Sequence, residues 1–420
     1  CLHHLSEEYG ALFTPTPELV ERKDTGQDWY PPNHFRPLVD WKLTAEEEAE
    51  MATWILGPLF QMTSLMLHEK RGHLTHMNAI GELCAQFRRG ILAEMRAHGP
   101  EGVRATVEAY HKLFPAAAGS GWHPDAVADM SSPEWQQLYV NAEHDGTVGV
   151  VTLARESYSW DVDAELNRAL DWLKAQGIDR VIVTGDFHLS TQMVGADTGE
   201  FFPAMEELDR GLAITRSWTR TARRLHDDFR VSVAFVPGKR CLGGMLELLM
   251  HCHYLVAVED ARFGWPEVTL PVVPGMEACH WPLRRADPGD RGRILEMLLT
   301  GRPVKATDAR GWLVDHAGPM EDALRTAWKL ASGSALGISR REVEAGPLED
   351  VAASVPPIPP ADSPLMEKGR EAIMRCVLDA SGATVDEALE IQARQAAEFL
   401  AGPVCRSGAV GAEYTRTTRI

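Results

Sequence analysis

Residues 239–275 read KRCLGGMLELLMHCHYLVAVEDARFGWPEVTLPVVPG, and they carry the strongest structural signal in the chain. The stretch begins as a strand, turns at Gly243-Gly244 and continues as a short apolar helix. A buried strand follows over residues 254–258, and two turns bounded by Gly264 and Pro266 come next. This change between helical and strand-like patterns predicts an α/β arrangement.

The glycine pair is a candidate ligand site. Glycine lets the backbone approach a ligand closely, and the amides at a helix start lie at the positive end of the helix dipole. Glu247 is expected in the first turn of this helix and Glu267 follows the buried strand, so both carboxylates can converge on one pocket. Paired carboxylates suit acid–base catalysis. The plainer interpretation is a tight turn, with Glu247 serving only the helix dipole.

Around this stretch, strands and helices alternate in the manner of repeated ββα or βαβ units. A hairpin is expected about the turn pair Asp145-Gly146. Because the apolar pattern changes from helical to strand-like at about residue 135, we predict one α/β domain over residues 135–335. Its expected strands include 181–184, 231–236 and 254–258, and its expected helices include 161–175, 206–226 and 245–251.

Residues 1–134 are predicted to form an arm followed by a helical domain. The prolines and weak periodicity of residues 1–43 indicate an irregular arm. Thr44 and Glu47 form a capping box that opens a helix, which Gly57-Pro58 is expected to interrupt. Two more apolar faces predict helices over 77–95, ending at Gly99-Pro100, and over 103–114.

Residues 336–420 are predicted to form a C-terminal linker and a helical segment. The run SVPPIPPADSP at 354–364 is typical of a stiff proline linker. Thr384 and Glu387 form a second capping box, and the final helix is expected to run from there to about Leu400.

Several ordered motifs resemble the crotonase (enoyl-CoA hydratase/isomerase) superfamily. The family's glycine turn and first glutamate are similar to Gly243-Gly244-Met245-Leu246-Glu247, and its A-x-F-G-x-P-E motif is similar to Ala261-Arg262-Phe263-Gly264-Trp265-Pro266-Glu267. Val273-Pro274-Gly275 matches its V-P-G turn. Further likeness is found in VGVVTLARESYSWDVDAELNRALDWL, RVIVTGDFHLSTQM and LLTGRPVKATDARGWLVDH, so the resemblance covers about residues 140–335.

The resemblance implies a spiral of ββα turns in which two backbone amides bind the thioester oxygen of an acyl-CoA and stabilise an enolate. Carried over by position, these are the amides of Thr191 and Gly244. One such donor lowers the barrier by about 3 kcal/mol. Glu247 and Glu267 occupy the positions of the two glutamates that hold and ionise water in the hydratases of the family.

The same resemblance implies the substrate contacts and the assembly. His188, Leu189 and Gly243 lie beside the expected oxyanion hole, and Arg155 stands where family members often place a residue near CoA. For His188, a solvated loop histidine is the plainer interpretation. The implied substrate and partner is an acyl-CoA, with coenzyme A as part of the substrate and no cofactor bound permanently. The implied assembly is a homotrimer or hexamer.

Two segments depart from the family pattern. Where the family has F-S-A-G-A-D, this chain has Phe187-His188-Leu189-Ser190-Thr191-Gln192, with Ser190 in place of glycine. After the V-P-G turn the family has a glycine-rich run, whereas this chain has the bulkier Met276-Glu277-Ala278-Cys279-His280-Trp281. We therefore expect an altered oxyanion loop and a reshaped acyl pocket.

The N-terminal extension keeps two alternatives open. A similar helical addition occurs in the cofactor-independent dioxygenase that acts on dihydroxyphenylacetyl-CoA, so oxygenation of an arylacetyl-CoA is one alternative. That enzyme has glutamine where this chain has Glu247 and lacks the second glutamate, so the pair here favours hydration, isomerisation or a related lyase reaction. The other alternative is a CoA-binding scaffold without catalysis. A decayed site would have no reason to keep both glutamates.

Composition excludes several classes of function. The chain has 420 residues, 42 basic and 60 acidic side chains and a formal charge of -18, which argues against nucleic acid or an anionic membrane as the main partner. There is no run of about 20 apolar residues. None of the seven cysteines forms a C-x-x-C pair, so a reduced, cytoplasmic protein is expected. Motifs of nucleotide, dinucleotide and serine-hydrolase chemistry do not occur.

Two groups of histidines and a row of arginines invite further interpretations. His251-Cys252-His253 and the pair His73 and His76 lack a third ligand at metal-binding spacing, so no metal site is predicted. A row of arginines at helical spacing suits either the CoA phosphates or a solvated helix face. Its members are Arg216, Arg220, Arg223 and Arg224.

Overall fold

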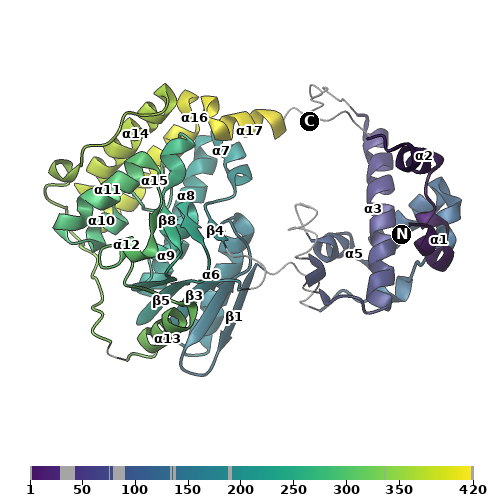
Figure 1. Cartoon of the computed structure of the whole chain (residues 1–420), viewed down its shortest axis with the longest axis horizontal. Coiled ribbons are helices and arrows are strands. Elements are labelled where there is room, and N and C mark those ends of the chain that lie inside the picture. The colour runs from purple at the N-terminus through teal and green to yellow at the C-terminus, as the bar shows by residue number, and fades with distance from the viewer. Residues whose placement is uncertain are drawn as a thin grey trace. The chain divides into compact units, whose positions relative to one another are not determined.

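The computed structural model describes most of the chain. The described residues are 2–28, 43–74, 76–78, 90–132, 135, 139–187, 192–334 and 336–417, without the side chains of 416–417. The chain divides into two compact units, residues 1–138 and residues 139–418, and each is described by itself (Figure 1). Within the described ranges, no helix has the length and apolar character needed to cross a lipid bilayer.

The N-terminal unit is helical. Its α-helices are α1 (Leu2–Tyr9), α2 (Pro17–Thr25), α3 (Ala45–His68) and α5 (Ile91–Leu113). Short 3₁₀ turns span Ala11–Phe13, Pro115–Gly119 and Pro124–Val127. The unit has its own core between α3 and α5, formed by Phe60, Met77, Leu92, Met95, Val103, Val107, Val127, Met130 and Trp135.

The prediction of an irregular arm over residues 1–43 is wrong in part, because α1 and α2 lie within it. The side chain of Thr16 caps α2, and Pro17 stands in its first turn, where a missing N–H costs no hydrogen bond. Gly26 ends the helix in the left-handed region, with φ 66. Pro17 therefore marks the start of a helix. Residues 29–42 of the predicted arm lie outside the described residues.

The capping box at the start of α3 is confirmed, with Thr44 and Glu47 bonding each other's backbone amides. The predicted interruption at Gly57-Pro58 is wrong, because α3 continues through Pro58 to His68. Packing of this turn against α5 outweighs the local cost of proline. The predicted break at Gly99-Pro100 is confirmed by the non-helical φ of 69 at Gly99 inside α5. In the predicted helix over 77–95, residues 79–89 lie outside the described residues.

Gly57→Ala is expected to destabilise the N-terminal unit. A Cβ at this position would lie 2.3 Å from the Cβ of Tyr110 on α5, so the two helices would have to move apart. Overpacking of this kind lowers the free energy of unfolding by about 1–3 kcal/mol. Urea denaturation followed by tryptophan fluorescence measures the loss. Gly119→Ala is the control, because a Cβ there meets no atom within 4 Å. An equal loss in both variants would contradict the packing argument.

The second unit is built on two sheets. The larger sheet has the order β1-β2-β3-β5-β7-β10, and its neighbours are parallel except for the antiparallel pair β1 and β2. The smaller sheet has the order β4-β6-β8-β9. The large-sheet strands are β1 (Val140–His144), β2 (Gly149–Leu153), β3 (Arg180–Gly185), β5 (Val231–Val236), β7 (Tyr254–Val258) and β10 (His316–Gly318). The small-sheet strands are β4 (Gln192–Val194), β6 (Arg240–Leu242), β8 (Arg262–Gly264) and β9 (Val304–Lys305).

The order of these strands confirms the predicted ββα repeats. The predicted strands at 181–184, 231–236 and 254–258 are β3, β5 and β7, and each is followed by a strand of the small sheet. The predicted hairpin about Asp145-Gly146 joins β1 to β2. The carboxylate of Asp145 accepts the backbone N–H groups of Thr147 and Val148 within the turn, and Gly146 adopts φ 95.

Helices cover both faces of the large sheet (Figure 1). α6 (Trp160–Ala175), α8 (Leu208–Asp227) and α9 (Gly243–Met250) correspond to the helices predicted at 161–175, 206–226 and 245–251. They pack in the main core on one face, while α13 (Met320–Ala331) buries its alanines on the other. Shorter helices complete the unit: α7 (Phe202–Glu206), α10 (Trp281–Arg285), α11 (Arg291–Thr300) and α12 (Ala306–Ala309).

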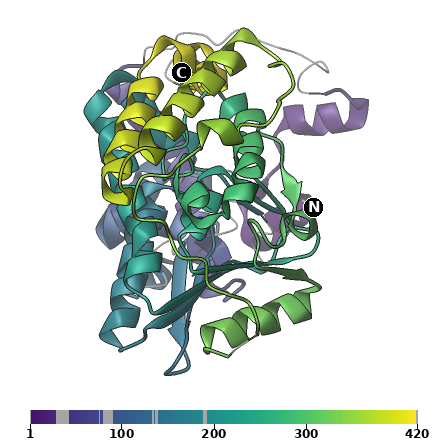
Figure 2. The same ribbon diagram turned by 90° about the vertical axis from the view of Figure 1, so that its left-hand side faces the viewer.

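The C-terminal helices pack onto the same core. They are α14 (Pro364–Ser381), α15 (Val385–Leu400), α16 (Pro403–Ser407) and α17 (Ala409–Thr417). α15 lies along α8, and in Figure 2 the yellow C-terminal helices gather beside the teal part of the chain. The capping box at Thr384 is confirmed. The prediction that this helix is the last one is wrong, because Gly402 and Pro403 begin a further helix.

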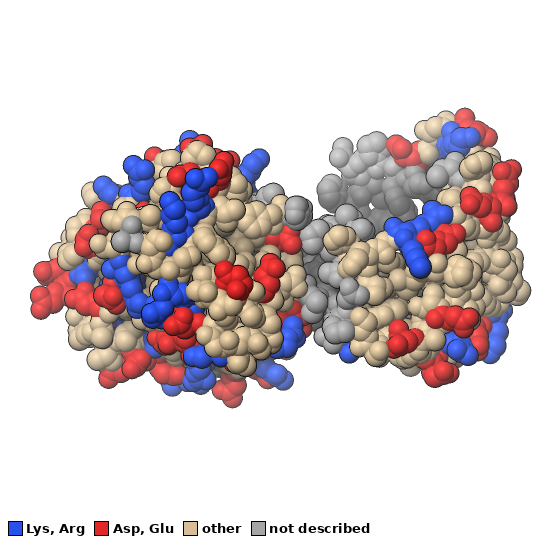
Figure 3. Space-filling view, turned by 90° about the horizontal axis from the view of Figure 1, so that it is seen from below, with Lys and Arg blue, Asp and Glu red and all other residues tan. Residues whose placement is uncertain are grey.

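Charged side chains are interspersed on the face of the second unit shown in Figure 3. Basic and acidic residues alternate there, and no broad field of one sign is visible on that face.

Candidate active site

A cavity of about 250 Å³ lies where α9 begins. Its wall comes from α8, α9, the 3₁₀ turn Pro266–Thr269, residues 272–276 and the helices α15 and α17. Most of this wall is apolar, with Phe201, Ile214, Trp218, Leu270, Val272, Val273, Met276, Leu400 and Val410 among its members. Glu247 and Glu267 are the two carboxylic acids in the described lining, so one cavity holds both predicted glutamates.

The glycine pair forms the start of α9. Gly243 has φ 54, in the left-handed region that favours glycine. A Cβ on Gly243 would lie 2.8 Å from Oε1 of Glu267, so only glycine leaves room for that carboxyl group. The next residue, Gly244, lies in the first helical turn, where a backbone N–H has no partner within the helix. Its amide is therefore available to an oxygen atom in the cavity.

Glu247 is buried and firmly oriented. It is the fifth residue of α9, so the prediction that it lies in the first turn is wrong; the helix begins at Gly243 itself. Its Oε2 accepts the backbone N–H of Met276 at 2.7 Å and that of Ala278 at 3.0 Å. Burial raises the pKa of Glu247 to about 7, and these backbone amides oppose that rise because they favour the ionised form.

Glu267 differs from Glu247 in its hydrogen-bond partners. It begins the turn that follows β8, and its Oε2 is closed off from solvent with no hydrogen-bond partner among the described residues. Burial and, to a smaller extent, the nearby Glu247 carboxylate together raise the pKa of Glu267 to about 8. Two like charges in one apolar cavity repel each other, so the pair favours a state with one proton on Glu267.

The predicted oxyanion loop lies mostly outside the described residues. His188, Leu189, Ser190 and Thr191 all fall in this gap, between Phe187 and β4. The second amide donor, the loop geometry and the contacts expected of His188 and Leu189 therefore stay predictions.

Arg155 does not line the cavity, and its guanidinium is engaged within the protein. Nη2 donates to Oδ2 of Asp197 at 3.0 Å, and Nη1 donates to the hydroxyl of Ser159 at 3.1 Å. The guanidinium also lies over the ring of Tyr139, 4.9 Å from its centre. The expected contact with CoA stays a prediction.

Comparison with known proteins identifies the family of the chain. Residues 143–339 match the family model described as enoyl-CoA hydratase/isomerase. A probable enoyl-CoA hydratase of Rhizobium meliloti is 33% identical over 198 residues, which cover 46% of this chain and 75% of that protein. The chain belongs to the enoyl-CoA hydratase/isomerase family, the crotonase superfamily.

Two further proteins are similar to parts of this chain. A probable enoyl-CoA hydratase of Mycobacterium bovis is 32% identical over 191 residues, 44% of this chain and 70% of that protein. A solved structure of a carnitinyl-CoA dehydratase from Mycobacterium thermoresistibile aligns with a TM-score of 0.49 and 18% identity, over 67% of this chain and 90% of that one. The family match begins at residue 143, so the N-terminal unit lies outside it.

Membership of the crotonase superfamily confirms the predicted fold, a ββα core with added N-terminal and C-terminal helices. It also places the chain among enzymes that act on CoA thioesters. The arginines of the row do not line the cavity, and their side chains range from 12% exposed at Arg223 to 66% exposed at Arg220. Arg216 pairs with Glu390 of α15 at 2.7 Å, and Arg224 pairs with Asp171 of α6. The row joins α8 to its neighbouring helices.

Sequence reasoning missed the acidic side chain that lies behind Glu247. Glu277 is only 1% exposed, and Arg223, His251 and His280 surround it. The bulky run after the V-P-G turn did indicate an altered segment. No local pattern revealed that Glu277 points inward, because its partners come from α8 and from the end of α9.

His251 and His253 have hydrogen-bond partners within the protein. No group of three or more His, Cys, Asp or Glu side chains suited to a metal occurs among the residues that the structure describes. His251 bonds Glu277, and Nδ1 of His253 accepts the backbone N–H of Ser232.

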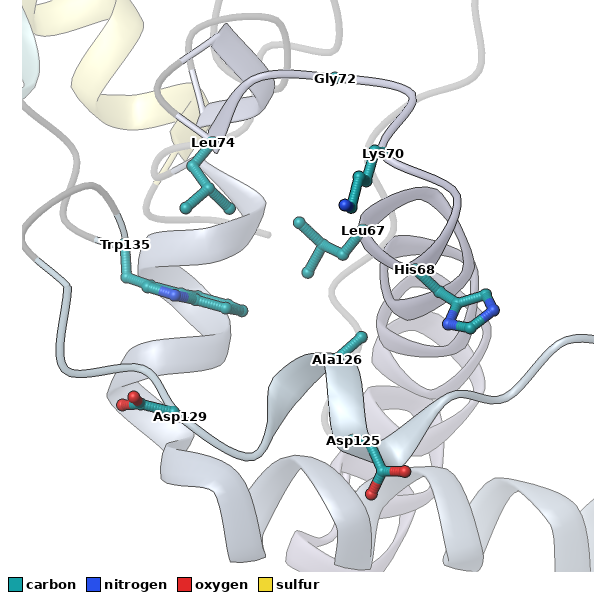
Figure 4. A pocket seen from close by; sticks show the side chains of 9 residues that line it. All are labelled: Leu67, His68, Lys70, Gly72, Leu74, Asp125, Ala126, Asp129 and Trp135. Carbon is teal, nitrogen blue, oxygen red and sulfur yellow. The ribbon is translucent and has the colours of Figure 1, made fainter.

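A larger cavity, of about 500 Å³, lies in the N-terminal unit (Figure 4). Figure 4 shows Leu67, Leu74 and Trp135 directed into it, while His68 and Asp125 point away from its centre. This arrangement lacks the pair of buried carboxylic acids and the helix start that meet in the smaller cavity. The smaller cavity is therefore the candidate active site.

Proposed function

We propose that the protein adds water to the double bond of an α,β-unsaturated acyl-CoA thioester. The observation that carries this proposal is the unequal environment of the two glutamates. Glu247 accepts two backbone N–H groups, which favours the ionised form, whereas Glu267 has a solvent-excluded oxygen with no partner among the described residues, which favours the protonated form. Hydration needs one base for water and one acid for the α carbon.

In the proposed reaction, Glu247 takes a proton from water while the water oxygen bonds to the β carbon. The electron pair of the double bond moves to the thioester oxygen, and the amide of Gly244 stabilises the resulting enolate. The amide of Thr191 is the proposed second donor. Glu267 then gives its proton to the α carbon as the thioester carbonyl re-forms. Transfer of a proton from Glu247 to Glu267 restores the starting state.

The remaining predicted residues are proposed as surroundings of the substrate. We place Gly243, His188 and Leu189 around the thioester and Arg155 near CoA. The apolar wall of the cavity supports an uncharged acyl group. Coenzyme A enters as part of the substrate, without a permanently bound cofactor. The homotrimeric or hexameric assembly and the cytoplasmic location stay predictions.

The alternatives have less support. Isomerisation uses the same acid and base, so the test must separate it from hydration. The matched relatives do not support cofactor-independent oxygenation or a catalytically inactive scaffold, and we propose neither.

A panel of 2-enoyl-CoA thioesters tests the function. The panel includes short, branched and aryl acyl groups, because an apolar wall does not by itself select among them. Product mass and dissolved oxygen are followed in the same vessel. A mass gain of one water without oxygen uptake supports hydration. Migration of the double bond without water makes the enzyme an isomerase, and oxygen uptake with release of CoA makes it an oxygenase.

The pH dependence of kcat/KM is expected to be bell-shaped, with its maximum between about pH 7 and 8. Burial raises the pKa of Glu247 to about 7 and that of Glu267 to about 8. Activity falls on the acid side because protonated Glu247 cannot accept a proton from water. Activity falls on the alkaline side because ionised Glu267 has no proton to give. Initial rates at low substrate concentration give the profile, and a profile that is flat over this range would contradict the assignment of both roles.

A further inference from the structure

Glu277 has a backbone conformation that side chains of L-residues rarely adopt. Its φ is 78, in the left-handed region, and its side chain is buried. It stands between Met276 and Ala278, whose amides both donate to Oε2 of Glu247. A left-handed residue between two donors turns both amides toward the same oxygen atom. The unusual conformation is therefore directly linked to the orientation of Glu247.

Three side chains hold Glu277 in this conformation. Nε of Arg223 donates to Oε2 of Glu277 at 2.9 Å, and its Nη2 donates to Oε1 at 2.6 Å. Nε2 of His251 lies 2.9 Å from Oε2, and Nε2 of His280 lies 3.1 Å from Oε1. These contacts hold the pKa of Glu277 well below its usual range, even though burial acts in the opposite direction.

His251 also connects Glu277 to the backbone of Glu247. Its Nδ1 lies 2.8 Å from the carbonyl oxygen of Glu247, while its Nε2 contacts the Glu277 carboxylate. Both of these oxygens accept hydrogen bonds, so each ring nitrogen of His251 faces an acceptor. The imidazole thus bridges the two glutamates.

The segment is anchored from the C-terminal side as well. The side-chain amide of Gln392 on α15 donates to the carbonyl of Pro274 at 2.8 Å and accepts the N–H of Cys279 at 3.2 Å. Arg223 reaches the start of the same helix through Asp386, at 3.0 Å. The segment that carries the two amides is therefore fixed at both of its ends and at its middle.

We propose that Glu277 is the positioning residue of Glu247: anchored by Arg223, His251 and His280, it holds the amides of Met276 and Ala278 on the carboxylate of Glu247. This inference rests on the role proposed above for Glu247. Glu277 itself does not line the cavity and touches no substrate.

The charges around Glu247 and Glu277 determine the direction in which the pKa of Glu247 shifts when Glu277 is replaced. Arg223 of α8, His251 beyond α9 and His280 face Glu277, with Asp386 of α15 and Arg284 of α10 behind them. Glu267, Glu277 and the thiol of Cys279 lie near Glu247. The negative charge of Glu277 raises the pKa of Glu247, whereas the amides that it positions lower it. Removal of the charge and loss of the amides therefore shift that pKa in opposite directions.

Glu277→Gln tests the proposal in the full-length protein. Isotope-edited infrared titration of glutamate carboxyl groups, assigned by the band missing in Glu247→Gln, reports the ionisation of Glu247 without any substrate. We expect the pKa of Glu247 to rise by about one unit, as the loss of one hydrogen bond to a charged group predicts. Where the wild type is active, the acid limb of kcat/KM moves upward by the same amount and kcat at pH 7 falls about fivefold, because the pKa of Glu247 rises from about 7 to about 8, with KM little changed.

Each outcome is decisive. A downward shift of the pKa of Glu247 would mean that Glu277 acts on Glu247 by its charge alone. An unchanged pKa of Glu247 in a less stable variant would mean that Glu277 has only a structural role. Either result overturns the proposal. The infrared result is independent of the reaction, so an inactive wild type would count against the proposed function and not against this inference.

Two more variants complete the test. Glu277→Gly adopts φ 78 without strain but lacks the anchoring carboxylate, so it should show the same upward shift if Glu277→Gln fails to fold. Asp163→Asn is the matched control, because Asp163 is a carboxylate 4% exposed whose partners, Tyr158 and Ser217, are not among residues 274–280. It is expected to lower stability without moving the pKa of Glu247, and an equal shift in this control would overturn the proposal.

Discussion

Glu267→Gln is expected to lower kcat by roughly 10²–10⁴-fold, the usual contribution of a positioned general acid. Glutamine preserves the shape of the protonated acid, but its amide gives no proton to the α carbon. Affinity for a CoA thioester should change little, because the cavity wall and the amide of Gly244 are unaltered. Single-turnover kinetics measure the chemical step, and equilibrium binding of a saturated acyl-CoA measures affinity.

Glu247→Gln is the companion variant and should lose turnover to a similar degree. Glutamine cannot accept the proton of water, although its carbonyl oxygen can still accept the amides of Met276 and Ala278. Normal turnover in both variants would contradict the acid–base assignment. Loss of acyl-CoA binding together with turnover would instead assign the glutamates to binding.

The stability of the Glu267→Gln protein tests the protonation of Glu267 independently of catalysis. The folded-state pKa of Glu267 is raised from 4.5 to about 8, so the protein binds its proton more tightly when folded. The wild type therefore loses stability as the pH rises from the unfolded-state value through about 8. Glutamine removes this loss. We expect the melting temperature of the variant to exceed that of the wild type increasingly over this range, which thermal denaturation at several pH values measures.

Gly243→Ala is expected to lower kcat by roughly 100-fold, the effect of misplacing a catalytic group by about 1 Å. The new Cβ would lie 2.8 Å from Oε1 of Glu267 and 3.1 Å from the Cα of Gly195, so the carboxyl group must leave its position. The left-handed φ of 54 adds backbone strain, and the free energy of unfolding should fall by about 1–3 kcal/mol. Single-turnover rates and denaturant unfolding measure the two effects.

Gly177→Ala separates strain from displacement of Glu267. Gly177 has a similar left-handed φ of 76, but a Cβ there meets no atom within 4 Å. This control should lose stability and keep its kcat. Equal losses of kcat in both variants would mean that strain, and not the carboxyl group, accounts for the effect.

Much of the architecture follows from local patterns. The two capping boxes, the hairpin at Asp145-Gly146 and the strands β3, β5 and β7 lie where the sequence predicts them. These features depend on residues close together in the chain, such as a threonine that bonds the amide of a glutamate three positions later. Local predictions fail where tertiary packing dominates, as at Pro58, which α3 carries within its length because its next turn is buried.

The candidate site, too, was predictable from the sequence only in part. Family motifs predicted the glycine turn and both glutamates, and the structure brings Gly243, Gly244, Glu247 and Glu267 to one cavity. The oxyanion loop with Thr191 lies outside the described residues, so its part of the site stays a prediction. The different environments of the two glutamates were not predictable, because they depend on the amides of Met276 and Ala278 and on the closed surroundings of Glu267.

The sequence by itself determined which residue types this protein brings to its chemistry and the order of the ββα units that carry them. Periodicity, capping and motif spacing are properties of neighbours in the chain, and they persist whatever the rest of the molecule does. Only the tertiary structure decided that Glu277 lies behind Glu247 and that α15 secures the segment between them. Burial and electrostatic coupling depend on distances in space between distant segments, and no local pattern contains those distances.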